Sequence, residues 1–307
     1  MVRTRRPHHH PLTVILDGFF IFRYPIRIMT ILDGKSYAST IRTKIKDRIN
    51  TLQTKPGLAI LLVGDDPASH IYVNLKQKAC EEVGIHFEKC EYTADVSESE
   101  LIKKITELNN RDDIHGILVQ LPLPTQNANH VIAAIDPRKD VDGFHPKNLE
   151  ALRANKPALA PAVVLGILKL IDKAVQGRER SGLHATIISS DFFAEPLQIL
   201  LREQQISSDI VRPSDPLFIQ KTTEADILIV ALGKPNLIHA DMIKHGAILI
   251  DVGTTKVDGK LVGDIDRASV ESRAGALTPV PGGVGPMTVA MLLLNTLNAY
   301  GKQKRTS

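Results

Sequence analysis

From residue 29 onward, continuous apolar runs alternate along the chain with stretches in which apolar residues recur at helical spacing. Apolar runs that end in glycine or a polar residue, such as residues 57–64 and 116–120, are typical of buried parallel strands. Ser97 and Glu100 form a capping-box pattern, which predicts the start of a helix. This first series predicts strands over residues 57–64, 86–92 and 116–120, and helices over residues 69–83, 97–109 and 127–135.

The same alternation resumes after residue 150. It predicts strands over residues 185–189, 208–211, 227–231 and 247–252, and helices over residues 163–175, 196–204, 240–245 and 288–300. The order of these elements predicts an α/β protein with two units, each built on a parallel sheet. We expect one domain over residues 29–148, completed by the C-terminal helix of residues 287–307, and a second over residues 149–286.

Residues 1–28 differ from the rest of the chain, because a basic start is followed by an apolar run from Pro11 to Phe22. Asp17 interrupts that run, which is too short to span a bilayer, and no small-residue cleavage site follows it. Met29 then opens a strand–turn–helix pattern that is typical of a domain start. We therefore expect residues 1–28 to be an extension outside the fold, with a targeting presequence as the alternative.

The composition narrows the class of protein. Apolar residues make up 43% of the 307 residues and charged residues 23%, as in ordinary globular domains. The formal net charge of +4 is modest and the basic residues are scattered, which argues against nucleic-acid binding. Cys80 and Cys90 have no zinc spacing and fit a reducing compartment, so we expect a cytoplasmic protein, or an organellar one if residues 1–28 are a presequence. We expect no metal and no membrane contact, since the triple histidine at residues 8–10 is too short for a metal site.

The segment from Thr278 to Thr288 holds three prolines and three glycines in eleven residues, directly before an apolar helix. Proline fixes φ and glycine lets other groups approach the backbone closely. This pattern predicts a rigid loop that presents backbone N–H groups at a helix start, where an anion or a polar ligand edge can dock. A tight structural turn is the alternative.

Polar side chains follow the predicted strands of the first unit, at the sheet edge where ligands bind in open α/β folds. Tyr72 and Lys76 share one face of a helix, and Gln120 ends a strand. Asp140 and Asp142 place two carboxylates in a turn. Each has a structural alternative, namely a solvated lysine beside a partly buried tyrosine, a capped strand end and an Asx turn. Together they form a candidate site.

Four motifs occur along the chain in a fixed order: Gly64-Asp65-Asp66-Pro67-Ala68-Ser69 with Tyr72-Val73-x-x-Lys76, Gln120-Leu121-Pro122-Leu123-Pro124, Asp140-Val141-Asp142-Gly143, and Pro279-Val280-Pro281-Gly282-Gly283-Val284-Gly285-Pro286-Met287-Thr288. Over roughly residues 29–300 the chain closely resembles the bifunctional methylenetetrahydrofolate dehydrogenase/methenyltetrahydrofolate cyclohydrolase family, FolD. The resemblance implies three catalytic residues, Lys76, Gln120 and Tyr72. It implies that the substrate, a tetrahydrofolate derivative, is bound by Ser69, Tyr72, Asp142, Pro281, Gly282, Gly283 and Val284.

The resemblance also implies a multifunctional enzyme of one-carbon metabolism that serves purine biosynthesis, forms a homodimer and carries a second, Rossmann-like domain for NADP. Its two steps are removal of a hydride from methylenetetrahydrofolate and addition of water to the resulting cationic methenyl carbon. The residue types agree with this chemistry. Asp142 can accept bonds from pterin N–H donors, and Tyr72 can lie against the aromatic part of the ligand. A lysine in a partly desolvated cleft beside a bound cation has a lowered pKa, so Lys76 can handle protons of the attacking water while Gln120 holds it in place.

One stretch departs from the family. Where the family has Gly-Arg-Ser-x-x-Val-Gly-x-Pro after the first strand of the second domain, this chain has Ser189-Ser190-Asp191-Phe192-Phe193-Ala194-Glu195-Pro196. This loop is one residue shorter, lacks glycine and arginine, and gains the carboxylates Asp191 and Glu195. The bulky residues in place of glycine and the added carboxylates oppose the approach of a pyrophosphate. The loss of two charge-assisted contacts would weaken NADP binding roughly a hundredfold or more. We therefore expect hydrolysis to exceed oxidation.

Later stretches on the cofactor side of the second domain still match the family. Arg212 can replace part of the lost phosphate contact. The cofactor positions that the resemblance implies are Ser189, Ser190, Arg212, Ser214, Gly233, Gly253 and Thr254. The altered loop leaves one functional alternative, a non-catalytic paralogue that binds folate or pairs with an active subunit. The presence of Lys76 and Gln120 argues against it, because a binding module would not require them.

Overall fold

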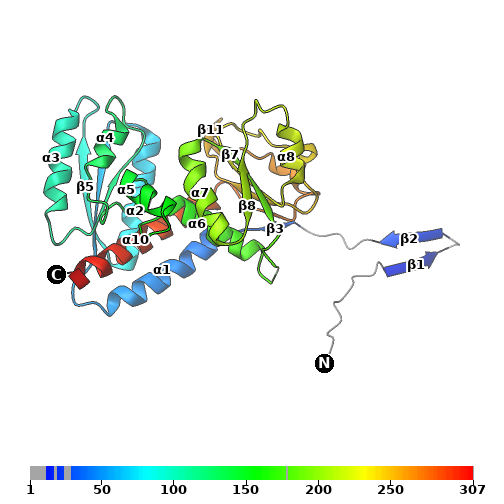
Figure 1. The fold of residues 1–307 in the computed structure, drawn as a ribbon, viewed down its shortest axis with the longest axis horizontal. Helices are drawn as coiled ribbons and strands as arrows, with labels where there is room; N and C mark the ends of the chain where they lie inside the picture. The colour runs from blue at the N-terminus through cyan, green and yellow to red at the C-terminus, as the bar shows by residue number, and fades with distance from the viewer. Residues whose placement is uncertain (1–11, 17–18, 24–28, 178, 307) are drawn as a thin grey trace.

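The structure, a computed structural model, describes residues 12–16, 19–23, 29–177 and 179–306. The strands β1 (Leu12–Leu16) and β2 (Phe19–Arg23) precede the main body and pair antiparallel with each other. Figure 1 shows this hairpin apart from the two larger sheets. The rest of the predicted extension over residues 1–28 lies outside the described residues.

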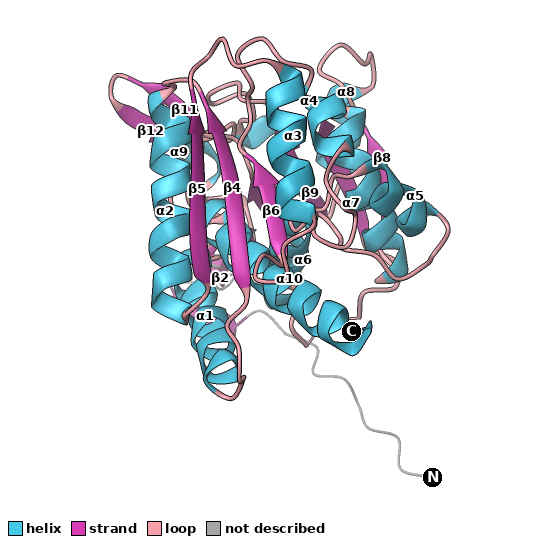
Figure 2. Ribbon diagram, turned by 90° about the vertical axis from the view of Figure 1, so that its left-hand side faces the viewer, coloured by secondary structure: helices cyan, strands magenta, loops and turns pink. Residues whose placement is uncertain are grey.

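The first unit of the body contains a parallel sheet with the strand order β5-β4-β6. Its strands are β4 (Gly57–Val63), β5 (His86–Tyr92) and β6 (Gly116–Val119). The helices of this part of the chain are α1 (Gly34–Asn50), α2 (Pro67–Val83), α3 (Glu98–Asn109), α4 (Ala128–Ala133) and α5 (Pro146–Arg153). Figure 2 shows the sheet flanked by α2 and α3, so that both of its faces are covered.

The second unit contains a six-stranded parallel sheet with the order β3-β13-β10-β9-β7-β8. Its strands are β3 (Thr30–Ile31), β7 (His184–Ser189), β8 (Ser207–Ile210), β9 (Ile227–Ala231), β10 (Ile248–Asp251) and β13 (Ala276–Leu277). A small hairpin joins β11 (Thr255–Val257) to β12 (Lys260–Val262). The helices here are α6 (Ala162–Ala174), α7 (Asp191–Glu203), α8 (Phe218–Glu224), the 3₁₀ turn η1 (Ala240–Met242), α9 (Arg267–Val270) and α10 (Val284–Thr306). The predicted α/β architecture with two parallel sheets is confirmed.

One apolar core runs through both units. Ile60 of β4 and Ile187 of β7 belong to the same cluster of buried residues, together with Met291 of α10. Because side chains alternate across a strand, Ala59 and Leu61 of β4 face a separate core beneath α3 and α4. Figure 1 shows α1 and α10 side by side below the first unit, each with one end at the second unit, so these two helices join the units.

Asn295 of α10 ties this helix to the segment that connects the two units. Its side-chain amide is buried and donates to the carbonyls of Val141 and Ala160, both at 2.9 Å. Gly143 lies beside the same segment with φ +87°, and a Cβ there would collide with the Ala160 carbonyl. The turn that holds Asp142 is therefore fixed from two sides.

Three predicted elements differ from the structure by three residues or more at one or both ends. The helix predicted over residues 196–204 begins at Asp191, since Ser190 is its N-cap and Pro196 lies inside it rather than at its start. The stretch treated as a loop before it is thus largely helical. The helix predicted over residues 240–245 is the short turn η1, and the last helix starts at Val284 instead of residue 288.

The first domain was predicted to begin at residue 29, but the chain enters through the second sheet. The strand β3 pairs in parallel with β13 at the edge of the six-stranded sheet. A two-residue strand has no periodicity that could assign it from sequence. The other domain boundaries stay predictions.

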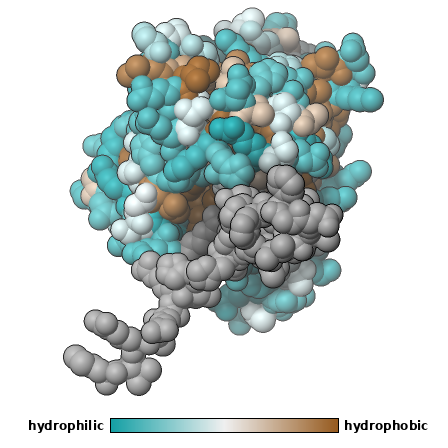
Figure 3. Space-filling model, turned by 90° about the vertical axis from the view of Figure 1, so that its right-hand side faces the viewer, coloured by the Kyte–Doolittle hydropathy of each residue, from teal (hydrophilic) through white to brown (hydrophobic). Residues whose placement is uncertain are grey.

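The surface of the second unit seen in Figure 3 is mostly hydrophilic, with scattered apolar residues. Among the helices that the structure describes, none combines the length and the apolar character needed to cross a membrane.

We expect Asn295→Ala to lower the free energy of unfolding by about 1–3 kcal/mol, because the buried Val141 carbonyl and the partly buried Ala160 carbonyl lose their donor. Urea denaturation of the variant measures this difference. Asn298→Ala is the matched control, since Asn298 is exposed on the same helix and the change should leave stability nearly unaltered. Equal stability of Asn295→Ala and the native chain would contradict the anchoring role.

Candidate functional site

Helix α2 carries the first group of candidate residues, and its start is fixed by a side-chain cap. The Asp66 carboxylate accepts bonds from the backbone N–H and the hydroxyl of Ser69, both at 2.8 Å. Pro67 occupies the first turn, where a missing N–H costs nothing. Ser69 was predicted to line the substrate site, and the structure shows its hydroxyl buried and engaged with Asp66.

Lys76 and Gln120 meet at the carboxyl end of the first sheet. The Lys76 ammonium donates to the Gln120 side-chain carbonyl at 2.8 Å, which confirms the predicted contact. The amide nitrogen of Gln120 donates to the Leu121 carbonyl at 2.7 Å, so the orientation of its side chain is set from both ends. Burial lowers the pKa of Lys76, and the nearby Asp142 charge opposes this shift.

The two carboxylates of the Asp-Val-Asp-Gly turn have different environments. Asp140 is buried and accepts bonds from the backbone N–H groups of Gly143 and His145, and from the amide of Asn148. It acts as a structural anchor, in line with the Asx-turn alternative. Asp142 is partly exposed and interacts electrostatically with Lys76. Burial raises the pKa of Asp142 to about 6, although the Lys76 charge works in the opposite direction.

Tyr72 links the first unit to the second. Its hydroxyl donates to the Thr254 hydroxyl at 3.3 Å, and Thr254 follows the carboxyl end of β10, an inner strand of the six-stranded sheet. Thr254 was predicted from sequence on the cofactor side and Tyr72 on the folate side. The structure therefore brings the two predicted sites into contact.

The proline- and glycine-rich loop packs on the start of α1. The backbone N–H of Lys35 donates to the Gly282 carbonyl at 2.9 Å, and a Cβ at Gly34 would collide with the Gly283 carbonyl. Gly282 has φ +110°, which side chains rarely tolerate. Pro281 is exposed, and Val284 begins α10 as a buried residue. The loop is also tied to β10, since the Thr278 hydroxyl accepts a bond from the Asp251 backbone N–H at 2.7 Å, and its role toward a substrate stays a prediction.

Two buried carboxylates shape the cofactor side of the second sheet. Asp251 accepts backbone bonds from Gly253, Asp264 and Ile265. The Asp264 carboxylate accepts bonds from the backbone N–H groups of Leu232 and Gly233 at 2.7 and 3.0 Å. Burial raises the pKa of Asp251 to about 7, against the effect of its three N–H donors. Asp264 was not identified from sequence, since an isolated aspartate carries no spacing signal.

The divergent stretch after β7 has partners that the sequence did not reveal. Asp191 forms an ion pair with Arg212 at 2.7 Å. Glu195 lies a turn further along α7 and pairs with Arg153 of α5 at 2.6 Å, and its effect on a pyrophosphate stays a prediction. Each of the two carboxylates is balanced by an arginine.

Phe192 also connects the two units. Its ring stacks on that of Phe144, with the centroids 5.0 Å apart and the planes inclined by 23°. Phe144 follows the turn that holds Asp142 by two residues. The start of α7 therefore contacts the turn on which a predicted substrate-binding residue sits.

The remaining residues that were predicted to bind the cofactor differ in burial and in hydrogen bonding. Ser189 is buried and donates to the Ala231 carbonyl at 3.1 Å, whereas Ser190 and Ser214 are exposed. The Ser190 side chain makes no cap bond to α7, so the first N–H groups of this helix have no side-chain cap. Uncapped N–H groups at a helix start, with Arg212 close by, fit a dinucleotide phosphate.

A cavity of about 650 Å³ lies elsewhere, between α1, α6 and α10. Apolar residues such as Ile41 and Met291 line it, and Lys44 and Arg48 are at its rim. None of the predicted catalytic, substrate-binding or cofactor-binding residues lines it, so we place the site by its polar groups and not by cavity size. In the part of the chain that the structure describes, no three His, Cys, Asp or Glu side chains gather as a metal site would require.

Two α/β units whose polar residues meet at the strand ends define the class of two-domain α/β enzymes. Two family models match the chain: "Tetrahydrofolate dehydrogenase/cyclohydrolase, catalytic domain" over residues 32–142, and "Tetrahydrofolate dehydrogenase/cyclohydrolase, NAD(P)-binding domain" over residues 161–304. The chain belongs to the tetrahydrofolate dehydrogenase/cyclohydrolase family, which confirms the resemblance seen in its motifs.

Individual relatives agree with this assignment. The bifunctional protein FolD of Nitratiruptor sp. is 43% identical over 284 residues, which cover 91% of this chain and 100% of that protein. The crystal structure of the FolD enzyme from Campylobacter jejuni has a TM-score of 0.86 at 38% identity and covers 90% of this chain and 99% of its own. A Trypanosoma brucei methylenetetrahydrofolate dehydrogenase-cyclohydrolase, complexed with NADP cofactor and inhibitor, has a TM-score of 0.85 at 33% identity, covering 91% and 99%.

We expect the Asp142 carboxyl to titrate at about 6, and Lys76→Met to raise its pKa further, because the variant removes a positive charge that favours the ionised form. Carbon NMR of the labelled side chain measures both values. Lys78→Met on the exposed face of α2 is the control and should leave the titration unchanged. An Asp142 pKa near 4 in the native chain would show that the carboxylate is well solvated.

Proposed function

We propose that this chain oxidises methylenetetrahydrofolate with a nicotinamide dinucleotide and hydrolyses the resulting methenyltetrahydrofolate to formyltetrahydrofolate. The observation that carries the proposal is the 2.8 Å contact between Lys76 and Gln120, next to the Asp142 carboxyl. Membership in the tetrahydrofolate dehydrogenase/cyclohydrolase family supports it. No observation favours the non-catalytic alternative.

Lys76 is the proton-handling residue of the hydrolytic step. Burial lowers its pKa, which increases the neutral fraction of the amine near neutral pH. The oxygen of a water molecule attacks the cationic methenyl carbon, and the neutral amine accepts the proton that the water loses. The ammonium then returns this proton to the ring nitrogen as the carbon–nitrogen bond breaks, and the hydroxyl of the adduct releases its own proton to solvent as it becomes the formyl carbonyl, so the positive charge of the substrate leaves as one proton. Gln120 holds Lys76 in position without adding charge, because its own amide is fixed by the Leu121 carbonyl.

Asp142 and Tyr72 bind the folate. An ionised Asp142 accepts hydrogen bonds from pterin N–H donors, which it does better above its pKa of about 6 than below it. Tyr72 places its ring beside the substrate while its hydroxyl reaches Thr254 of the second unit. This contact supports a site in which the folate and the dinucleotide lie close together.

A bound dinucleotide would supply the acceptor for the hydride of the methylene carbon. The residues proposed to hold it are Ser190 and Arg212 near the start of α7, and Gly233, Gly253 and Thr254 in the loops at the next strand ends. Asp264 and Asp251 hold two of these loops by their backbone N–H groups. The homodimer and the cytoplasmic location stay predictions of the sequence.

We expect Lys76→Ala to slow methenyltetrahydrofolate hydrolysis by about a hundredfold or more, the range for loss of a positioned acid or base. The decay of methenyltetrahydrofolate absorbance measures the rate. Lys78→Ala removes an exposed lysine from the same helix and should keep the native rate. A near-native rate in Lys76→Ala would remove this residue from the mechanism.

We also expect hydrolysis to run faster than oxidation on one preparation of the enzyme. Water addition needs no nucleotide, whereas oxidation depends on a helix start that has no glycine and carries Asp191. Parallel assays of the two steps at the same folate concentration compare them. Equal turnover with a micromolar NADP Michaelis constant would contradict this expectation.

A further inference from the structure

The pair formed by Asp191 and Arg212 lies at the carboxyl ends of two neighbouring strands. The chain passes from Ser189 at the end of β7 through Ser190 directly into α7, of which Asp191 is the first residue. The neighbouring strand β8 ends two residues before Arg212. The carboxylate and guanidinium are 2.7 Å apart, and both side chains are more than half exposed, at 73% and 56%.

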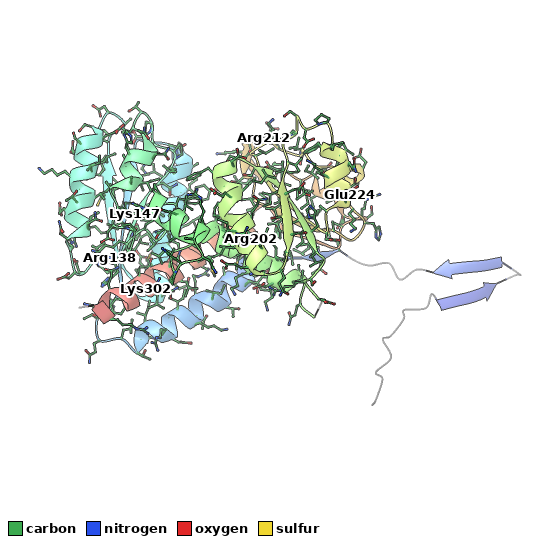
Figure 4. All side chains as sticks on the ribbon, in the orientation of Figure 1. Arg138, Lys147, Arg202, Arg212, Glu224 and Lys302 are labelled. Atoms are coloured by element: carbon green, nitrogen blue, oxygen red, sulfur yellow. The ribbon has the colours of Figure 1, made fainter. Side chains whose placement is uncertain are left out.

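In α/β nucleotide-binding units, residues after the second strand recognise the ribose 2′ position. A carboxylate there binds a free hydroxyl, and an arginine binds a phosphate. Figure 4 shows Arg212 at the upper edge of the second unit, while Arg202, near the end of α7, lies lower. This chain thus has both a carboxylate, Asp191, and an arginine, Arg212, at this edge of the sheet, and the two are paired with each other.

We propose that the Asp191–Arg212 ion pair sets the cofactor preference of this chain and favours a dinucleotide with a free 2′-hydroxyl over one with a 2′-phosphate. This inference rests on the proposed dehydrogenase function. A 2′-phosphate must take Arg212 away from Asp191 and then lies close to that negative charge. A hydroxyl can donate to the Asp191 carboxylate while the ion pair stays intact.

The neighbouring groups on α7 are occupied by other contacts. Glu195 is paired with Arg153, and Phe192 is stacked on Phe144. Neither contact involves Arg212. A substitution of Asp191 alone can therefore change the charge beside the proposed ribose 2′ site, without disturbing the contacts that join α7 to the first unit.

The test is titration calorimetry of the full chain with NAD and with NADP, without folate. In the native chain we expect tighter binding of NAD. Asp191→Asn keeps the shape of the side chain but releases Arg212, so NADP affinity should rise about tenfold while NAD affinity does not increase. Adding Arg212→Gln to this variant should abolish the gain. Glu195→Gln is the matched control, because it removes a carboxylate from the same helix and should leave the ratio of the two affinities unchanged.

Tighter binding of NADP than of NAD by the native chain, or an unchanged affinity ratio in Asp191→Asn, would overturn the inference. So would the absence of nucleotide binding in every variant. Hydrolysis of methenyltetrahydrofolate by the same preparations separates the two levels of failure. If hydrolysis persists and a nucleotide binds, only the proposed role of the ion pair is wrong. Hydrolysis without any nucleotide binding also removes the dehydrogenase step, and loss of hydrolysis in the native chain removes the proposed function.

Discussion

Buried carboxylates that accept backbone N–H groups are the constraint on which both halves of the site depend. Asp140 holds the turn beside the residues proposed to bind folate, and Asp251 and Asp264 hold the loops after β10 and β9. Loops at the ends of parallel strands cannot satisfy their own N–H groups within the sheet, and a buried unpaired N–H is costly. Each of these carboxylates therefore fixes a loop conformation that leaves neighbouring side chains available for a ligand.

Hydrogen-bond donors and charged partners also give chemically similar carboxylates different roles. Asp140 and Asp142 are two residues apart, yet the first is saturated by N–H donors and the second faces the Lys76 charge. Asp191 and Glu195 are one helical turn apart, and their arginine partners come from different units. In both cases the role of a carboxylate follows from which donors surround it, and not from its position in a motif.

The sequence predicted most of the strands because their apolar runs are long and bounded by glycine or polar residues, as in β4 and β9. It predicted the Lys76–Gln120 contact, since the carboxyl ends of parallel strands converge. It did not predict the start of α7, because Pro196 looked like a helix start while Ser190 and Asp191, which favour that position, were interpreted as parts of a loop. The pairing of Arg212 with Asp191 and the stacking of Phe192 on Phe144 join residues far apart in the chain, and no local pattern encodes them.

The edge strand β3 gives the chain a distinctive order of assembly during synthesis. Thr30 is among the first residues of the body to leave the ribosome, yet its partner Ala276 is translated almost last. The apolar face of α1, with Ile45 and Ile49, belongs to a core that α10 completes. Until translation nears its end, the nascent chain carries an unpaired strand edge and an incompletely covered helix face, two features that make incomplete chains prone to aggregation. The first segment of the body to be translated is thus also among the last to complete its pairing in the fold.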